Sequence, residues 1–371
     1  MGGNAKVNKP PFRVMTMKEI EAIPWNGFNV VSTFSGAGGS CLGYRMAGFR
    51  VLWASEFVPA AQEVYRANHP TSYLDERDIR EVTAQQILDQ IGMKRGELDL
   101  LDGSPPCASF SISGKREEGW GKVKKYSDTD QRVDDLFFEY VRLVKGLQPK
   151  VFVAENVPGL IQGKAKGYFK MILKALKECG YQVKAKELDA SWLGVPQARR
   201  RLIFMGVRND LGMQPVFPKP QKFQYTIRDA LRDLVLGKVD DAEVYSALLK
   251  DGTLSLKLWE LTPPGMTLKE AYASLIGGLG FFNYRKCSFD QPASTIMASV
   301  ASLCHPSEPR RFYIKELRRF STFPEDFVLT GSYGQQWERI GRAVPPVMMM
   351  NLSATIRDEI LRRLPCTNSE S

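Results

Sequence analysis

Short apolar runs alternate with segments of helical periodicity between about residues 28 and 209, and this alternation limits the fold more than any other feature of the sequence. The β-branched run FNVVST leads into the glycine-rich stretch FSGAGGS and then into CLGYRMAGF, which has helical spacing. Further predicted strands are RVLWASE, ELDLLDGS, KVFVAENV and RRRLIFMGVR, with helical segments between them. Strands that alternate with helices form βαβ units, so we predict an α/β fold with a mixed, mostly parallel sheet.

The alternation fails after Asn209, and the next residues are irregular and rich in Pro, Gly and Lys. Helical patterns return at FYIKELRRFSTFP and at VPPVMMMNLSATIRDEILRRL. We therefore predict a catalytic α/β domain built from 26–209 and 295–371, with a smaller irregular domain inserted over 210–294. Residues 1–25 are polar and contain prolines, which predicts a tail or a covering arm.

The chain contains no apolar run near the roughly 20 residues that a membrane helix needs. Its first residues lack the apolar core of a signal peptide, so we expect a cytoplasmic protein without a membrane partner. The six cysteines lie far apart, and neither of the two histidines has a partner at metal-binding spacing. We expect neither a disulfide framework nor a metal site.

The net charge favours a polyanionic partner. Lys and Arg number 51 against 41 Asp and Glu, which gives a net charge of +10 and an isoelectric point near 9.2. A surface this basic suits nucleic acid first, although an ordinary basic enzyme remains an alternative.

Two predicted strand ends carry residues suited to a nucleoside cofactor. The glycine turn after the first strand allows close approach of a ligand, and the helix behind it begins with free N–H groups. Glu56 ends the second strand, where a carboxylate accepts hydrogen bonds from ribose hydroxyls, and Phe57 beside it is suited to stacking on adenine. The alternative is that Glu56 only caps the next helix.

Two further strand ends carry candidate catalytic groups. Cys107 follows two prolines at the C-terminal edge of the sheet, where a thiolate is a candidate nucleophile, although a structural cysteine is the alternative. Glu155 follows another strand, and a carboxyl group in such a cleft can donate a proton or else cap a helix.

An arginine cluster precedes the last strand of this region, in GVPQARRRLIF. Strand alternation predicts Arg199 and Arg201 on one face and Arg200 on the other. Arginines on one face suit a phosphate or a base edge, and a solvated loop is the alternative.

The motifs taken together resemble the DNA cytosine-5 methyltransferase family. The glycine turn, Glu56, PPC, ENV and QxRxR occur in the family's order and spacing, followed by DQPASTI, ELRRFSTFP and IGRAVPP. The resemblance covers roughly 28–208 and 288–360. It implies a Rossmann-like class I methyltransferase domain, a target recognition domain in the inserted segment, S-adenosylmethionine as cofactor, double-stranded DNA as substrate and a monomer of bacterial or phage type.

The same resemblance implies roles for individual residues. Cys107 adds to C6 of a flipped cytosine, Glu155 holds or protonates N3, and Arg199 contacts O2. The implied cofactor contacts are Phe34, Ser35, Gly36, Gly38, Gly39, Glu56, Phe57, Asp78, Ile79, Pro106, Arg342, Ala343 and Val344. The implied DNA contacts are Ser109, Ser111, Lys115, Arg116, Lys122, Arg201 and Thr295.

Arg342 departs from the family pattern, which has asparagine at this place in the GxAVPP motif. A guanidinium about 6 Å from a sulfonium is repelled by roughly 3 kcal/mol at an effective dielectric of 20, so an anion should lie between them. That anion is a DNA phosphate, the cofactor's own carboxylate or, as a sharper hypothesis, the carboxylate of carboxy-S-adenosylmethionine, which would yield 5-carboxymethylcytosine. An RNA cytosine-5 methyltransferase and a relative that only binds DNA are further alternatives.

Overall fold

The computed structural model describes residues 9–106, 124–126, 129–131, 136–162, 165–278, 280, 284–300 and 303–365. The chain divides into two compact units. The sheet unit contains Ile20–Leu188, Arg200–Lys219 and Met349–Ser371. The second unit contains Met1–Glu19, Asp189–Arg199 and Pro220–Met348. No helix of the described residues has the length and apolarity needed to cross a membrane.

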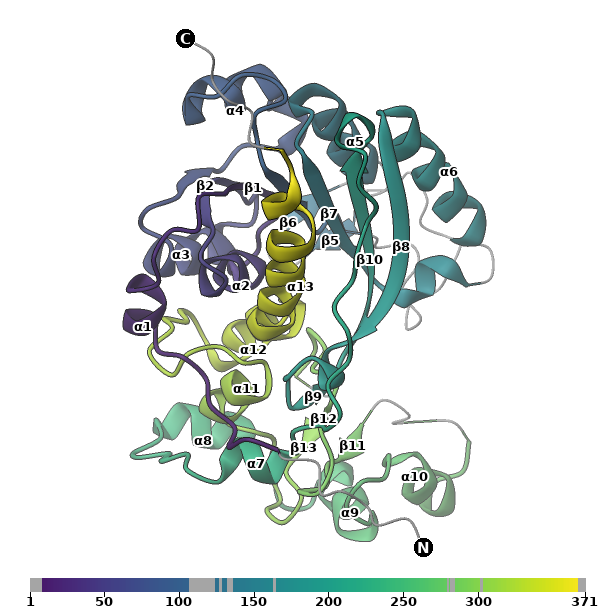
Figure 1. The fold of residues 1–371 in the computed structure, drawn as a ribbon. Helices are drawn as coiled ribbons and strands as arrows, with labels where there is room; N and C mark the ends of the chain where they lie inside the picture. Colours follow the sequence, from purple (N-terminus) through teal and green to yellow (C-terminus); the bar gives the residue numbers. More distant parts are fainter. Residues whose placement is uncertain are drawn as a thin grey trace, which may run out of the picture. The chain divides into compact units, whose positions relative to one another are not determined.

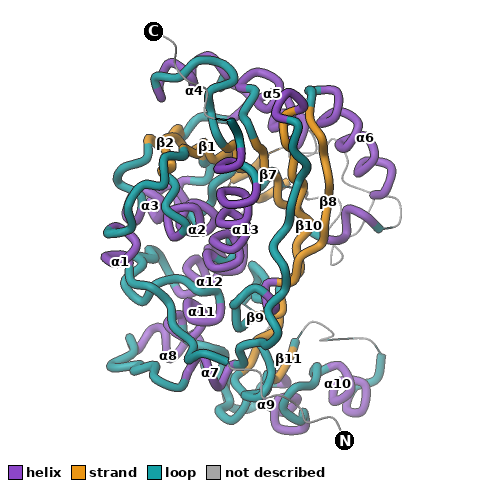
Figure 2. The backbone as a smooth tube through the Cα atoms, viewed as in Figure 1, coloured by secondary structure: helices purple, strands orange, loops and turns teal. Residues whose placement is uncertain are grey.

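The sheet unit is built on a seven-stranded sheet with strand order β3-β2-β1-β4-β7-β10-β8. Its strands are β1 (Asn29–Thr33), β2 (Arg50–Ser55), β3 (Tyr73–Asp75), β4 (Leu100–Gly103), β7 (Val151–Asn156), β8 (Tyr181–Asp189) and β10 (Arg200–Arg208). The pairings from β3 through to β7 are parallel, and β10 runs antiparallel to β7. Figure 2 shows β10 and β8 as long neighbouring strands. The predicted α/β fold with a mixed, mostly parallel sheet is confirmed.

Helices cover both faces of this sheet (Figure 1). On one face α4 (Ala84–Ile91), α5 (Leu136–Leu147) and α6 (Ala165–Glu178) pack on strand residues such as Val31 and Phe152 in one apolar core. The opposite face carries α2 (Gly39–Met46), α3 (Pro59–Asn68) and the Met349–Glu359 part of α13 (Pro346–Glu359). The central strands are apolar on both sides because both faces are covered.

The remaining elements of the described residues are short. The second unit holds α7 (Ile227–Leu231), α8 (Asp241–Ala247), α9 (Leu254–Leu261), α10 (Lys269–Leu275), α11 (Ile314–Phe320) and α12 (Tyr333–Arg342), with the strand pairs β9 (Gln197–Ala198) with β12 (Ala293–Ser294) and β11 (Arg285–Lys286) with β13 (Leu303–Cys304). Helix α1 is Met17–Glu21, and β5 (Lys124–Tyr126) pairs with β6 (Thr129–Gln131). Single 3₁₀ turns lie at Ile79–Glu81, Pro158–Ile161, Ala190–Trp192, Asn209–Leu211 and Leu361–Arg363.

The second unit differs from the inserted domain predicted over 210–294. It begins at Pro220, because 210–219 belongs to the sheet unit, and it also takes in 1–19, 189–199 and 295–348. Within 295–348, Phe312, Phe320 and Trp337 share one apolar core with Ile227 of α7. The expected assignment of 295–348 to the catalytic domain therefore differs from the packing. The inserted-domain boundaries could not be placed from the sequence, because short helices in an irregular stretch give little periodicity.

The N-terminal segment covers part of the second unit. Phe12 is buried in that unit's core, and the Tyr225 hydroxyl donates to the carbonyl oxygen of Pro10 over 3.1 Å. The backbone amide of Met17 donates to the carboxylate of Asp326. Of the two readings of the first 25 residues, the covering arm describes residues 9–19.

Candidate active site

The glycine turn after β1 has the strained backbone that close ligand approach requires. Phe34, Gly36 and Gly38 all have positive φ, at 54°, 57° and 83°. The Ser35 amide donates to the Ser55 carbonyl over 2.9 Å, which joins the turn to the end of β2. A Cβ on Gly36 would meet open space, whereas one on Gly38 would lie 2.1 Å from Nε2 of His69. Gly38 is thus fixed by both backbone conformation and packing, and Gly39 begins α2 directly behind it.

Glu56 links the glycine turn to the start of α3. Its Oε2 accepts from the Gly36 amide and its Oε1 from the Val58 amide, both over 2.7 Å. Val58 is the N-terminal cap residue of α3, so the helix-capping alternative describes one half of what Glu56 does. A carboxylate can accept several hydrogen bonds at once, which is the property that a ribose-binding acid needs. Phe57 next to it is 38 % exposed, as a stacking side chain needs to be.

Asp78 and Ile79 lie in the turn after β3. Oδ1 of Asp78 accepts from the Arg80 amide, and Oδ2 pairs with the Arg80 guanidinium over 2.8 Å. The side chain of Ile79 is buried in the core of the sheet unit. The contacts of these two residues are therefore to their own turn and to the core.

The strand end that leads to Cys107 is held by its two neighbours in the sheet. The Ser104 amide donates to the Thr33 carbonyl over 3.3 Å, and Nδ2 of Asn156 donates to the Pro105 carbonyl over 3.2 Å. Pro106, half-buried, ends the described part of this loop. Cys107 and five predicted DNA contacts lie outside the described residues, namely Ser109, Ser111, Lys115, Arg116 and Lys122.

Glu155 is paired with Arg201 in the sheet unit. The Nε of Arg201 lies 2.5 Å from Oε1 of Glu155, and each side chain is 13 % exposed. The antiparallel register of β7 and β10, in which Glu155 faces Ile203, brings these side chains together. Arg200 is exposed and forms an ion pair with Glu187.

Arg199 lies in the second unit and is 1 % exposed. Its two terminal nitrogens donate to the carbonyl oxygens of Ile296 and Gly341 over 2.9 and 2.8 Å. The strand is interrupted here, since β9 ends at Ala198 and β10 begins at Arg200. The expected simple alternation through Arg199–Arg201 is therefore broken. Sequence periodicity could not reveal this interruption.

Arg342 ends α12 and faces a carboxylate of its own helix. Its Nε donates to Oε1 of Glu338 over 2.7 Å, and the other oxygen of Glu338 lies 3.0 Å from the buried Arg339 guanidinium. Burial opposes ionisation of Glu338, but the hydrogen bond from Arg342 and the charge of Arg339 outweigh it and lower its pKa. Glu338 therefore supplies an anion beside Arg342, and an anion between Arg342 and the cofactor's sulfonium stays a prediction.

The remaining predicted site residues have local contacts in the second unit. Val344 is buried, and the Ala343 amide donates to the Arg339 carbonyl at the end of α12. Oγ1 of Thr295, on the exposed side, donates to the Ala198 carbonyl over 2.6 Å.

Asp102 is a buried polar residue that the motif search missed. It is 2 % exposed and accepts hydrogen bonds from the hydroxyls of Ser32 and Tyr44, each over 3.0 Å. Burial raises the pKa of its carboxyl group to about 7, although the two hydrogen bonds lower it and the charge of Glu155 raises it again. The signal was that two acidic residues, Asp99 and Asp102, interrupt the otherwise apolar sequence LDLLDG.

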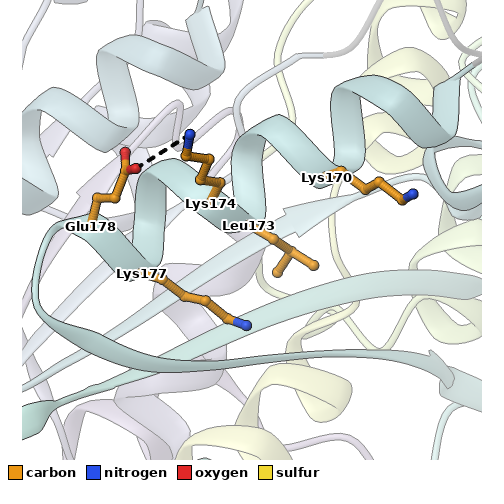
Figure 3. A pocket seen from close by; sticks show the side chains of 5 residues that line it. All are labelled: Lys170, Leu173, Lys174, Lys177 and Glu178. Atoms are coloured by element: carbon orange, nitrogen blue, oxygen red, sulfur yellow. Dashed lines mark ion pairs between the residues drawn. The ribbon is translucent and has the colours of Figure 1, made fainter.

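A separate surface depression is lined by one face of α6 (Figure 3). Its lining residues are Lys170, Leu173, Lys174, Lys177 and Glu178, with an ion pair of 3.7 Å between Lys174 and Glu178. The lysines are exposed, and none of these five side chains is a nucleophile or a buried acid. The depression has the character of a solvated helix face.

The sheet, the glycine turn and the acidic residue after β2 define a nucleoside-binding α/β domain of the methyltransferase class. Residues 28–358 match the family model described as C-5 cytosine-specific DNA methylase, and the chain belongs to this family. It is a DNA (cytosine-5)-methyltransferase of a family that uses S-adenosylmethionine.

Similar proteins span most of the chain. The type II methyltransferase M.PspPI of a Psychrobacter species is 33 % identical over 94 % of this chain and 82 % of that protein. M.NgoPII of Neisseria gonorrhoeae is 28 % identical over 93 % of this chain and 100 % of that protein. An Escherichia coli prophage protein described as a DNA modification methyltransferase has a similar structure, with a TM-score of 0.67 at 24 % identity, over 91 % of this chain and 100 % of that one.

Proposed function

We propose that this enzyme methylates C5 of a flipped cytosine in duplex DNA through a covalent bond between Cys107 and C6 of the base. The observation that carries the proposal is the pairing of Glu155 with Arg201 on the strand next to the one that leads to Cys107. A thiolate, an acid and a cation are then supplied by neighbouring strand ends of one sheet. This is the set of groups that the addition step needs.

The residues of the chain would act in sequence. The Cys107 thiolate adds to C6, and Glu155 hydrogen-bonds or protonates N3, so that electron density moves to C5. After C5 has gained the methyl group it loses its proton, and the bond between sulfur and C6 breaks to restore the thiolate. Base flipping costs a few kcal/mol, which stacking and hydrogen bonds in the pocket repay.

The glycine turn and Glu56 fit the cofactor. The open space at Gly36, the half-buried Glu56 carboxylate and the exposed Phe57 ring offer a backbone cradle, a ribose acceptor and a stacking face. When bound there, S-adenosylmethionine supplies an electrophilic methyl group. Phe34, Ser35, Gly38 and Gly39 shape the cradle.

The geometry supports exchanging the roles first expected for two arginines. Arg201 is paired with Glu155, so we assign it the contact with base O2 and the orientation of that acid. Arg199, buried against two main-chain carbonyls, is assigned a role in holding the second unit together.

Methyl is proposed as the transferred group. In the carboxymethyl alternative the cofactor's carboxylate would pair with Arg342, whereas Glu338 already accepts from Nε of Arg342 over 2.7 Å and offsets part of its charge, which supports methyl. The type II names of the curated relatives support a role in DNA modification beside a restriction enzyme.

The test is transfer from labelled S-adenosylmethionine to duplex DNA and, in parallel, to transfer RNA. We expect label in DNA only, loss of transfer in Cys107→Ser because a hydroxyl is a far weaker nucleophile, and a trapped protein adduct on DNA containing 5-fluorocytosine. With carboxy-S-adenosylmethionine present at equal concentration, mass spectrometry should find 5-methylcytosine in both the wild type and Arg342→Asn. Carboxymethylcytosine from the wild type alone would instead support the alternative cofactor.

A further inference from the structure

A small group of polar side chains lies buried beneath the glycine turn. We call Ser32, Ser35, Tyr44 and Asp102 the polar floor. Ser32 is the last residue but one of β1, Asp102 lies opposite it on β4, and Tyr44 projects from α2. Ser32, Tyr44 and Asp102 are at most 2 % exposed, whereas Ser35, in the turn itself, is half-buried.

Hydrogen bonds connect the floor from the turn to the carboxylate. Oγ of Ser35 donates to Oγ of Ser32 over 3.0 Å, and Ser32 donates to Oδ2 of Asp102 over 3.0 Å. Tyr44 donates to Oδ1 from the helix that follows the turn. A single carboxylate thus joins both arms of the turn, β1 and α2, to β4.

The same residue is close to the loop of the proposed nucleophile. The Asp102 carbonyl accepts from Oγ1 of Thr33 over 3.1 Å, and the Thr33 carbonyl accepts from the Ser104 amide. Asp102 is five residues before Cys107 in the chain. A shift at this point of β4 would therefore affect both the turn and the loop.

The surroundings make a carboxylate costly here. Within the described parts of the chain Asp102 forms no ion pair. The titratable groups that influence it or are influenced by it are Cys41 and Tyr44 on α2, Tyr140 on α5 and Glu155 on β7. Burial raises the pKa of the Cys41 thiol to about 11, and the charge of Glu155 raises the pKa of Asp102.

An apolar side chain would fill this strand position more stably than a buried acid, since burying a charge without a cation is unfavourable. Natural chains break such rules mainly where function gains from it.

We propose that Asp102 is a positioning residue, whose carboxylate holds the glycine turn in its cofactor-binding shape and couples that turn to the strand leading to Cys107. The proposal rests on the proposed function, because it assigns the turn to the cofactor. The ionised group is the stronger acceptor for both hydrogen bonds, so protonation should loosen the turn.

The test measures binding of S-adenosylmethionine by calorimetry between about pH 5 and pH 9, an interval centred on the Asp102 pKa of about 7. Asp102→Asn keeps the shape and removes the charge. Asp99→Asn is the matched control, because Asp99 joins the same two strands at their other end, through the Asn29 amide and Lys150. Ser32→Ala interrupts the floor while leaving Asp102 in place.

We expect wild-type affinity to rise with pH through neutrality. Asp102→Asn should bind the cofactor about tenfold more weakly at pH 8, because one charge-assisted hydrogen bond is lost. The remaining pH dependence of its affinity should be only that of the cofactor's own titrating groups. Ser32→Ala should weaken cofactor binding by the same factor, and the double variant Ser32→Ala/Asp102→Asn should bind no more weakly than either single variant. Asp99→Asn should have wild-type cofactor affinity. Equal weakening by Asp99→Asn, or wild-type affinity in Asp102→Asn, would overturn the proposal.

A second readout separates this proposal from the proposed function. Amide hydrogen exchange of residues 34–39, measured without cofactor, should be faster in Asp102→Asn than in Asp99→Asn. If the wild type fails to methylate DNA but exchange responds in this way, the positioning role stands and the proposed function falls. Unchanged exchange in Asp102→Asn would remove the positioning role whatever the activity.

Discussion

At the scale of single residues, the cation that pairs with Glu155 is the main difference between the sequence prediction and the structure. The sequence assigned the base contact to Arg199, whereas the structure pairs Glu155 with Arg201. The motif QxRxR identified both arginines, but only the β7–β10 register determines which one meets the acid. The break in the strand at Arg199 depends on pairing of β9 with β12, which lies almost a hundred residues away in the sequence. Local periodicity carries no information on such a contact, so the residue types were predictable and their partners were not.

Replacing each arginine by alanine tests which of the two acts in catalysis and which stabilises the fold. We expect Arg201→Ala to lower kcat about 100-fold with unchanged cofactor affinity, since one preorganised donor is lost. Arg199→Ala should lower the free energy of unfolding by roughly 2–3 kcal/mol, because two buried carbonyls lose their donors. Urea titration and single-turnover transfer measure the two effects. A stable Arg199→Ala variant with a large loss of kcat would instead support Arg199 as the residue that contacts O2 of the base.

The Asp102 carboxyl group also predicts how stability depends on pH. Its folded pKa of about 7 exceeds the ordinary value of 3.8, so its contribution is fully present below about pH 4 and is lost as the pH rises through 7. The three-unit difference corresponds to something on the order of 4 kcal/mol. Asp102→Asn should therefore gain stability relative to the wild type from pH 5 to pH 9, as measured by urea unfolding. A difference that stays constant over this range would show that the carboxyl group does not titrate as expected.

At the scale of elements, the sequence predicted the strands and helices around the sheet because their patterns are long and regular. The helices α8, α9 and α10 were missed, since each spans at most eight residues in a stretch without clear periodicity. The glycine turn was predicted from its composition, but the sequence did not show why a glycine is needed at position 38. Gly38 is packed against His69, which is buried and stacked on Tyr65 at 4.5 Å.

Two glycine substitutions separate backbone strain from this packing. Gly38→Ala meets both a positive φ and the buried His69 ring, so we expect a loss of roughly 2–4 kcal/mol in stability and at least about tenfold in cofactor affinity. Gly92→Ala, at the end of α4, meets a φ of +66° and open space, and should cost roughly 1–2 kcal/mol without affecting the cofactor. Thermal unfolding and calorimetry distinguish the two. Equal effects on cofactor binding would mean that the His69 contact is irrelevant.

At the scale of the whole molecule, the fold class and family followed from motif order, whereas the division into units did not. The predicted and observed divisions differ at 295–348 because helices α11 and α12 carry family motifs yet bury their apolar sides with α7. The core that a helix joins is determined by contacts between residues far apart in the sequence. The order of motifs along the chain carries no information on these contacts. The predicted role of 210–294 in recognising the target sequence stays a prediction.

The net charge of +10 makes a prediction that belongs to the whole molecule. Each phosphate that the protein neutralises adds about −0.9 to the slope of log K against log salt concentration. We expect a slope between about −4 and −8 for a duplex of some 20 base pairs, because several lysines and arginines should contact the backbone at once. Fluorescence anisotropy from about 50 to 300 mM salt measures it, with cofactor affinity as the control, which should change little because that site is local and partly buried. Since phosphate contacts do not read sequence, target and non-target duplexes should show similar slopes and differ mainly in intercept. A slope near zero for both would mean that the basic surface does not meet DNA, and that the charge serves another purpose.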